Sequence, residues 1–174
     1  GVDHLTIHHP NEMAQSEAVT GKLQANYWLH NSFVKFNNNK MSKSSNGFIS
    51  LEDLKKKGYN CMDYRFLVLQ THYKKSLNFT WKSLEAARKG LNNIIKEIAF
   101  YNKPKTGCIE LELKFYEALA DDLNTSKALS ILQKIIESNN SSSAKLKSIL
   151  KIDEVLGLGL KKLRVEALNI PIKY

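Results

Sequence analysis

The second half of the chain alternates apolar and polar residues with the spacing of amphipathic helices. Apolar residues recur three or four positions apart in four segments: Trp81 to about Ala99, 109–120, 125–136 and 146–160. A polar stretch with proline and glycine, 101–107, separates the first segment from the rest. Gly157 or Gly159 suits the end of the last helix. The pattern predicts one long helix followed by a bundle of three or more shorter ones.

A turn interrupts the pattern between residues 120 and 125. Asn124 or Thr125 suits the N-cap of the following helix, because a short polar side chain accepts a hydrogen bond from the first backbone N–H groups. Asp121 and Asp122 are poor candidates for metal ligands, and we expect them to act in capping. A polar linker is predicted at 139–143.

The first half predicts shorter elements. Pro10 suits the first turn of a helix that runs through residues 13–18. Residues 27–29 and 33–36 are rich in aromatic side chains and alternate in part, which predicts two short strands around a turn.

Two helices are predicted after residue 50. Ser50 with Asp53 three positions later indicates the N-cap of a short helix that stops at Gly58. A mostly apolar helix follows at 62–73. The predicted fold class is therefore mainly α with a small α/β part.

Positive charge is concentrated in one region of the chain. The 174 residues have a formal net charge of +9. Residues 35–89 contain twelve Lys or Arg and four Asp or Glu, an excess of eight positive charges. Such a zone favours a polyanionic partner, although a lysine-rich solvated surface has the same composition.

The cysteine content and the length of the apolar runs indicate in which cellular compartment the protein is expected. Cys61 and Cys108 are the two cysteines, far apart in sequence, and there is no signal peptide or long apolar span. We therefore expect a protein of the reducing cytoplasm that does not enter a membrane.

The five residues Lys40 to Ser44 read Lys-Met-Ser-Lys-Ser and lie between turn-forming segments. Lysine is a compact point charge suited to phosphate groups. Lys40 and Lys43 therefore predict a loop that binds the phosphates of a nucleotide, with a solvated lysine loop as the alternative.

A second candidate site lies about thirty residues upstream. His8 and Glu12 stand four positions apart, so a helix places an imidazole and a carboxylate on one side. This pair suits Zn²⁺, but two ligands cannot complete a zinc site. His9 and His4 are further candidates, although His8 and His9, as neighbours on a helix, are not expected to bind the same ion.

These motifs together resemble one enzyme family. The order of Gly1-Val2-Asp3, His8 to Glu17, Asn26 to Asn31 and the Lys40 to Ser44 loop is similar to that of the cysteinyl-tRNA synthetases, which are class I aminoacyl-tRNA synthetases. The resemblance implies the C-terminal piece of a Rossmann-type catalytic domain, a helical stem-contact region and an all-α anticodon-side bundle.

The resemblance also implies a division of the chain. We expect residues 1–50 to be the end of the catalytic domain, 51–103 the stem-contact region, and 104–174 an incomplete tRNA-binding domain. The chain begins without methionine and lacks the histidine-rich signature that class I synthetases carry near the start of their nucleotide fold. We expect it to be the C-terminal part of a longer enzyme, inactive by itself.

The resemblance assigns roles to individual residues. Lys43, supported by Lys40, would bind ATP phosphates and stabilise departing pyrophosphate, while Asp3 would bind the ribose and His30 the adenine side. His8 and Glu12 would bind Zn²⁺ with two cysteines that lie upstream of this chain. An open zinc position would select the thiolate of cysteine over a hydroxyl.

The implied reaction is the activation of L-cysteine with ATP and Mg²⁺, followed by transfer of the cysteinyl group to tRNA(Cys). We expect a monomer. Two alternatives stay open: a zinc-dependent cysteine ligase that acts on an amino-sugar, and a noncatalytic RNA-binding module derived from a synthetase.

Overall fold

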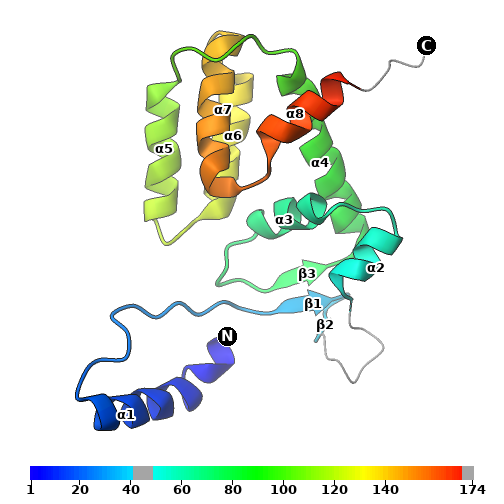
Figure 1. The fold of residues 1–174 in the computed structure, drawn as a ribbon. Helices are drawn as coiled ribbons and strands as arrows, with labels where there is room; N and C mark the ends of the chain where they lie inside the picture. Colours follow the sequence, from blue (N-terminus) through cyan, green and yellow to red (C-terminus); the bar gives the residue numbers. More distant parts are fainter. Residues whose placement is uncertain (41–48, 170–174) are drawn as a thin grey trace.

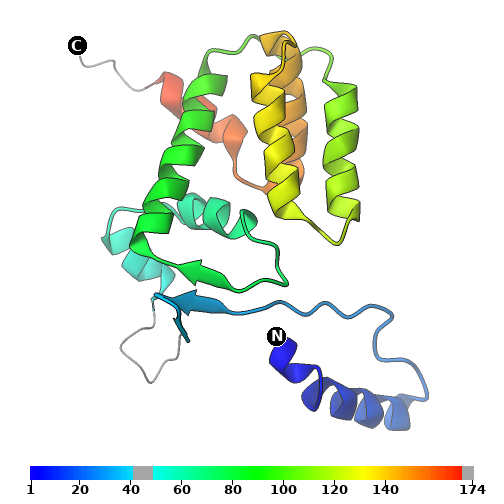
Figure 2. The ribbon, with the colours of Figure 1, turned by 180° about the vertical axis from the view of Figure 1, so that it is seen from behind.

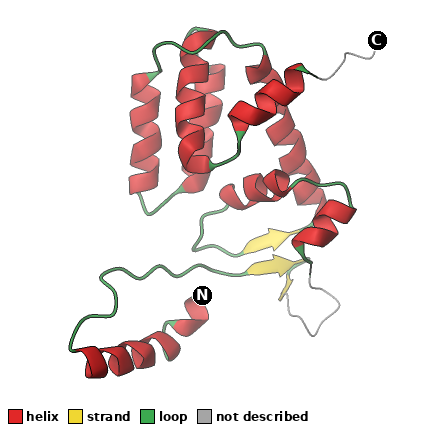
Figure 3. Cartoon of the chain, viewed as in Figure 1, coloured by secondary structure: helices red, strands yellow, loops and turns green. Residues whose placement is uncertain are grey.

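The computed structural model describes residues 1–40 and 49–169, and this part is mainly helical with one small sheet (Figures 1 and 3). The helical elements in chain order are a 3-10 turn η1 (Val2–His4), α1 (His8–Thr20), α2 (Leu51–Lys56), α3 (Cys61–Leu69), α4 (Trp81–Ala99), α5 (Ile109–Ala120), α6 (Thr125–Glu137), α7 (Ser142–Leu156) and α8 (Leu160–Leu168). The strands are β1 (Val34–Phe36), β2 (Asn39–Lys40) and β3 (Leu77–Phe79). The predicted fold class is confirmed.

The sheet has the strand order β2-β1-β3. β1 pairs antiparallel with β2 and parallel with β3, with Val34 opposite Leu77 and Phe36 opposite Phe79. A parallel pair needs a long crossover, which here contains α2 and α3. Phe79 and Leu77 point into the core, so β3 attaches the sheet to the helices.

Three successive helices begin at well-formed N-caps. Ser50, Asn60 and Thr80 accept hydrogen bonds from the first turns of α2, α3 and α4, and each takes part in a capping box. Capping satisfies backbone N–H groups that have no partner within the helix. The predicted cap at Ser50 with Asp53 is confirmed.

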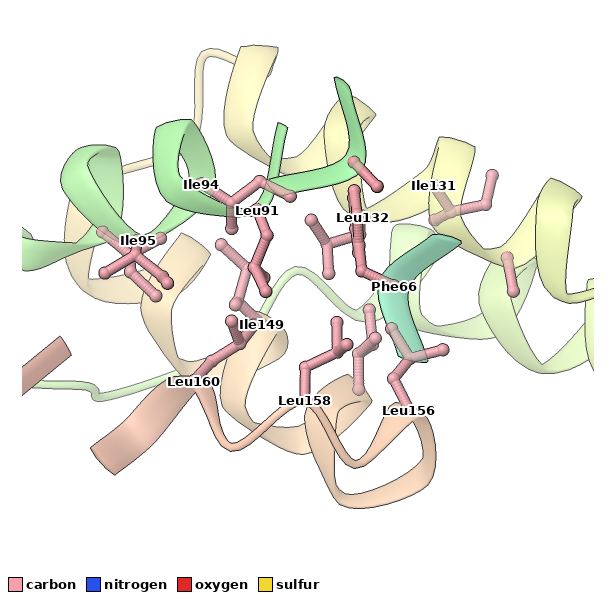
Figure 4. Packing of buried hydrophobic residues seen from close by; sticks show 14 of the residues in the cluster. Phe66, Leu91, Ile94, Ile95, Ile131, Leu132, Ile149, Leu156, Leu158 and Leu160 are labelled. Carbon is pink, nitrogen blue, oxygen red and sulfur yellow. The ribbon is translucent and has the colours of Figure 1, made fainter. Parts of the chain in front are cut away.

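The core is formed by the inner faces of α3, α4, α6 and α7 (Figure 4). The predicted apolar face of α4 is confirmed, because its members are buried: Leu84, Ala87, Leu91, Ile94, Ile95 and Ile98. Ile149 of α7 and Leu132 of α6 face this surface in Figure 4. Full burial of one such side chain contributes about 1.5 to 3 kcal/mol, so this face of α4 holds the helices together.

Helices α5, α6 and α7 lie side by side as a bundle, and α8 crosses beside α4 (Figures 1 and 2). Gly157 ends α7 with φ 64°, a left-handed conformation that glycine adopts at low cost. Asp153 then accepts hydrogen bonds from the backbone N–H groups of Leu158 and Leu160 at 2.8 and 2.7 Å. This arrangement turns the chain into α8.

In the described part of the chain, no helix has both the length and the apolar character that crossing a membrane requires.

Two local predictions were wrong. Residues 27–29 form no strand, because this extended segment finds no neighbouring strand in the described part of the chain. The helix predicted at 62–73 ends at Leu69, where the chain turns toward β3. The predicted end of the last helix near Gly157 or Gly159 is confirmed, because α7 ends at Leu156 with Gly157 as its C-cap, and a further helix, α8, begins at Leu160.

Candidate functional site

The first candidate site is built from η1, α1 and the extended segment that leads to β1 (Figure 1). The backbone N–H of Val2 donates to the carbonyl of Asn31 at 3.1 Å. This hydrogen bond places Asp3 beside the segment that carries His30. Asp3 and His30, both predicted to bind the nucleotide, thus lie on neighbouring segments of the chain.

Four histidines and one tryptophan gather at this place. The ring of His9 lies 4.9 Å from that of His30 and 4.8 Å from that of Trp28, measured between centroids. His4 lies 4.9 Å from His8 and 5.6 Å from His9. The cluster is formed by residues 4–9 and 28–30, which only the folded chain brings together.

Several polar atoms of this cluster are buried without a hydrogen-bond partner in the described part of the chain. They are Nδ1 of His9, Nε1 of Trp28 and Nε2 of His30. A buried polar atom without a partner costs free energy. These atoms are therefore available to bind a polar ligand.

His8 and Glu12 occupy the exposed side of α1. They are one helical turn apart, which places their side chains on the same face. Both residues are exposed, and neither forms a hydrogen bond or an ion pair with the described residues. A histidine and a carboxylate in this state have ligand atoms free for a metal ion.

The zinc expectation can be tested against the donor set. Among the described residues, no group of three or more His, Cys, Asp or Glu side chains is arranged to hold a metal ion. The pair of His8 and Glu12 fits Zn²⁺ in chemical type, yet it supplies two of the four ligands that a tetrahedral site has. The expected cysteine ligands are not residues of this chain. Neither Cys61 on α3 nor Cys108 before α5 lies in this cluster.

The predicted phosphate loop is described only at its start. Lys40 belongs to β2, where its backbone is paired with that of Lys35 on β1. Lys43 lies outside the described residues. β2, which ends at Lys40, is an edge strand of the sheet and lies at the far end of the segment that carries His30 (Figure 1).

The basic zone contains a row of stacked side chains between α2 and α4. Lys57 lies over the ring of Trp81 at 4.8 Å, and Trp81 stacks on Tyr59 with centroids 6.0 Å apart. Arg88 lies over Tyr59 at 5.4 Å. Cation–aromatic contacts of this kind hold charged side chains in place. The periodicity of the sequence does not predict this row, although residues 55–59 and 81–89 contain its aromatic and basic side chains.

One prediction about the acidic turn was wrong. Asn124 is the N-cap of α6 and accepts from the backbone N–H of Lys127 at 3.1 Å, as expected. Asp122 does not cap this helix. Its carboxylate instead accepts hydrogen bonds from Tyr73 and Lys74, which precede β3.

Comparison with known proteins identifies the class of this chain. Residues 1–89 match the family of tRNA synthetases class I (C) catalytic domain, and residues 114–161 match the DALR domain. The first match covers the histidine cluster, the sheet and the start of α4. The chain belongs to the class I (C) tRNA synthetase family.

Individual relatives are named cysteine–tRNA ligases. One from Treponema denticola is 37% identical over 190 residues, which cover 92% of this chain and 38% of the relative. One from Burkholderia lata is 37% identical over 174 residues and covers 98% of this chain and 37% of the relative. One from Azobacteroides pseudotrichonymphae is 41% identical over 159 residues, which cover 83% of this chain and 32% of the relative. The chain spans less than two fifths of the length of these relatives.

Proposed function

We propose that this chain carries part of a cysteine–tRNA ligase. In the proposed reaction ATP activates L-cysteine to cysteinyl-adenylate, and the cysteinyl group then moves to tRNA(Cys). The observation that carries the proposal is the alignment of 92% and 98% of the chain with relatives of this name. It includes the histidine cluster as well as the helical bundle.

The proposal divides the chain into three working parts. Residues 1–50 would complete the catalytic domain, 51–103 would contact the stem of the tRNA, and 104–174 would bind the anticodon side. The parallel pairing of β1 with β3 supports a close association of the first two parts. The exposed lysines around the row of Lys57 and Arg88 support a polyanionic partner there.

The nucleotide would be bound by Asp3, His30, Lys40 and Lys43. Asp3 is about half exposed, and a carboxylate accepts hydrogen bonds from ribose hydroxyls. Nε2 of His30 has no partner among the described residues, which supports a role toward the base. Lys43, helped by Lys40, would stabilise the charge that grows on pyrophosphate as it departs from ATP and Mg²⁺.

The amino acid would be selected beside α1. His8 and Glu12 would hold Zn²⁺ together with two ligands from outside this chain. When bound, the ion could expand its coordination to take the substrate's sulfur as an additional ligand, and it accepts a thiolate far better than a hydroxyl. The exposed, unpaired state of both side chains supports this assignment. His9 packs between Trp28 and His30. This position suits a residue that supports the zinc ligands better than one that binds the ion itself.

The proposal is tested on the complete gene product. We expect cysteine-dependent exchange between ATP and pyrophosphate, and the formation of cysteinyl-tRNA with tRNA(Cys). Exchange without charging would favour a ligase that acts on an amino-sugar, and tRNA binding without exchange would favour a noncatalytic module. Either result would refute the proposal. The same proposal expects a monomer in the cytoplasm, which light scattering and fractionation can check.

A further inference from the structure

The turn between α5 and α6 has an unusual backbone. Asp122 and Leu123 have φ angles of 53° and 52°, in the left-handed region that residues other than glycine seldom adopt. The turn is held by backbone hydrogen bonds, from Leu123 to the carbonyl of Leu119 at 2.9 Å and from Asn124 to that of Ala118 at 3.1 Å. This conformation turns Asp122 away from the bundle.

Asp122 is contacted by three consecutive residues from a distant part of the chain. The hydroxyl of Tyr73 donates to Oδ1 at 2.6 Å, and Nζ of Lys74 donates to Oδ2 at 2.5 Å. Nε2 of His72 lies 3.0 Å from the backbone carbonyl of Asp122. The hydrogen bonds from Lys74 and Tyr73 lower the pKa of the Asp122 carboxyl below its ordinary value, so this residue is ionised at neutral pH.

The backbone of Tyr73 contacts the nucleotide side at the same time. Its carbonyl accepts from the N–H of Ser32 at 2.8 Å, two residues after His30. The same segment is also held by the N–H of Leu77, which donates to the carbonyl of Phe33 at 2.9 Å. Tyr73 therefore touches the segment that carries His30 with its backbone and the helical bundle with its side chain.

The two matched families meet at this contact. Tyr73 lies within residues 1–89, and Asp122 lies within residues 114–161. A second polar contact between these parts is the hydrogen bond from Nε of Arg65 on α3 to the carbonyl of Leu156 at the end of α7, at 2.7 Å. Two separated contacts fix an orientation. The apolar core shared by α3, α4, α6 and α7 also joins these parts, but the turn at Asp122 is exposed, so its contact with Tyr73 restrains an end of the bundle that the core does not hold.

We propose that Tyr73 and Asp122 are positioning residues that set the orientation of the helical bundle relative to the nucleotide side. This inference rests on the proposed function, in which one tRNA must bind the bundle and present its end to the site near His30. An error of about 1 Å in such an alignment can cost a factor of about one hundred in rate. The formation of cysteinyl-adenylate does not involve the bundle. Loss of the contact should therefore impair transfer to tRNA and spare activation.

The test uses the complete gene product with Asp122→Asn and Tyr73→Phe. Asparagine tolerates the left-handed backbone, so the change removes the charge and keeps the turn. Asp121→Asn is the matched control, because Asp121 pairs with Lys127 inside the bundle at 3.6 Å. We expect kcat/KM for tRNA charging to fall about tenfold in each variant of the contact, with ATP–pyrophosphate exchange within about twofold of wild type. The double variant should be no worse than either single one.

Unchanged charging in Asp122→Asn would overturn the inference, and so would equal losses of charging and exchange, which indicate a general structural defect. A distance measurement separates this result from failure of the proposed function. Spin labels attached through unnatural amino acids at Lys22 and Asn139, which leave every cysteine of the protein unlabelled, report the separation of the two parts. We expect a broader distance distribution in Asp122→Asn than in Asp121→Asn. Equal distributions would refute the positioning role even if the wild-type protein charged no tRNA.

Discussion

Glu112 and Lys151 form an ion pair between α5 and α7, with 2.7 Å between Oε2 and Nζ, and the carboxylate is buried. The other oxygen of Glu112 accepts from the hydroxyl of Ser148 at 2.6 Å, and that hydroxyl accepts from the N–H of Cys108 at 2.6 Å. Both carboxylate oxygens are thus satisfied. This network ties the loop before α5 to the middle of α7.

Replacement of this carboxylate is expected to destabilise the bundle. Glu112→Gln removes the charge that Lys151 neutralises and weakens a buried hydrogen bond, so the free energy of unfolding should fall by about 1 to 3 kcal/mol. Chemical denaturation measures this difference. Glu110→Gln is the matched control on the exposed side of the same helix, where the pair with Lys114 is solvated, and it should have little effect. Equal stability of the two variants would contradict the importance of the buried network.

The same residue predicts a dependence of stability on pH. Burial raises the pKa of Glu112, but the hydrogen bonds from Lys151 and Ser148 outweigh it, and the pKa lies below its ordinary value of 4.5. Its contribution is therefore fully present above pH 4.5 and is lost as pH falls through the lowered pKa. The gap in unfolding free energy between wild type and Glu112→Gln should narrow in this acid range. A gap that stays constant from pH 7 to below the lowered pKa would show that ionisation of Glu112 does not stabilise the fold.

Helices were predictable where the signals are local. The apolar face of α4 and its N-cap Thr80 lie within one continuous segment, so periodicity and capping residues define both the face and the start. β3 contains three residues, and its partner β1 lies about forty residues upstream. No local pattern reveals such a pairing. The aromatic residues 27–29 have strand-like composition, yet a strand also needs a neighbour that the sequence does not specify.

The candidate site likewise has a part that the sequence predicts and a part that only the fold reveals. The spacing of His8 and Glu12 follows from helix geometry and could be read directly. The approach of His9 to Trp28 and His30 depends on how the chain returns after α1, which periodicity does not encode. The acidic turn at Asp121 and Asp122 has the composition of a helix cap, so the sequence predicts capping. Only the folded chain shows that Asp122 contacts Tyr73 and Lys74 instead.

Lys43 is expected to act in the activation step. Lys43→Ala in the complete gene product should lower the rate of cysteine-dependent ATP–pyrophosphate exchange at least tenfold, which corresponds to about 1.4 kcal/mol of barrier. The affinity for cysteine should be nearly unchanged, because the lysine is proposed to act on phosphate. Lys22→Ala changes an exposed lysine after α1 and should leave the rate unaltered. Exchange at the wild-type rate in Lys43→Ala would remove this residue from the mechanism.

His8 is expected to bind zinc, and the metal content of the protein tests this directly. His8→Ala should reduce the zinc bound by the complete gene product well below one ion per chain, because a tetrahedral site that loses one of four ligands binds far more weakly. Activation of serine relative to cysteine should rise, since coordination of the substrate to the metal is proposed to distinguish thiolate from hydroxyl. His72→Ala is a suitable control, because this histidine lies beside Asp122 and away from the cluster. Elemental analysis of both variants after gel filtration gives the ratio of metal to protein. If His8→Ala retained one zinc per chain, the ion would have to be held by other residues, and the role of α1 in amino-acid selection would be lost with it.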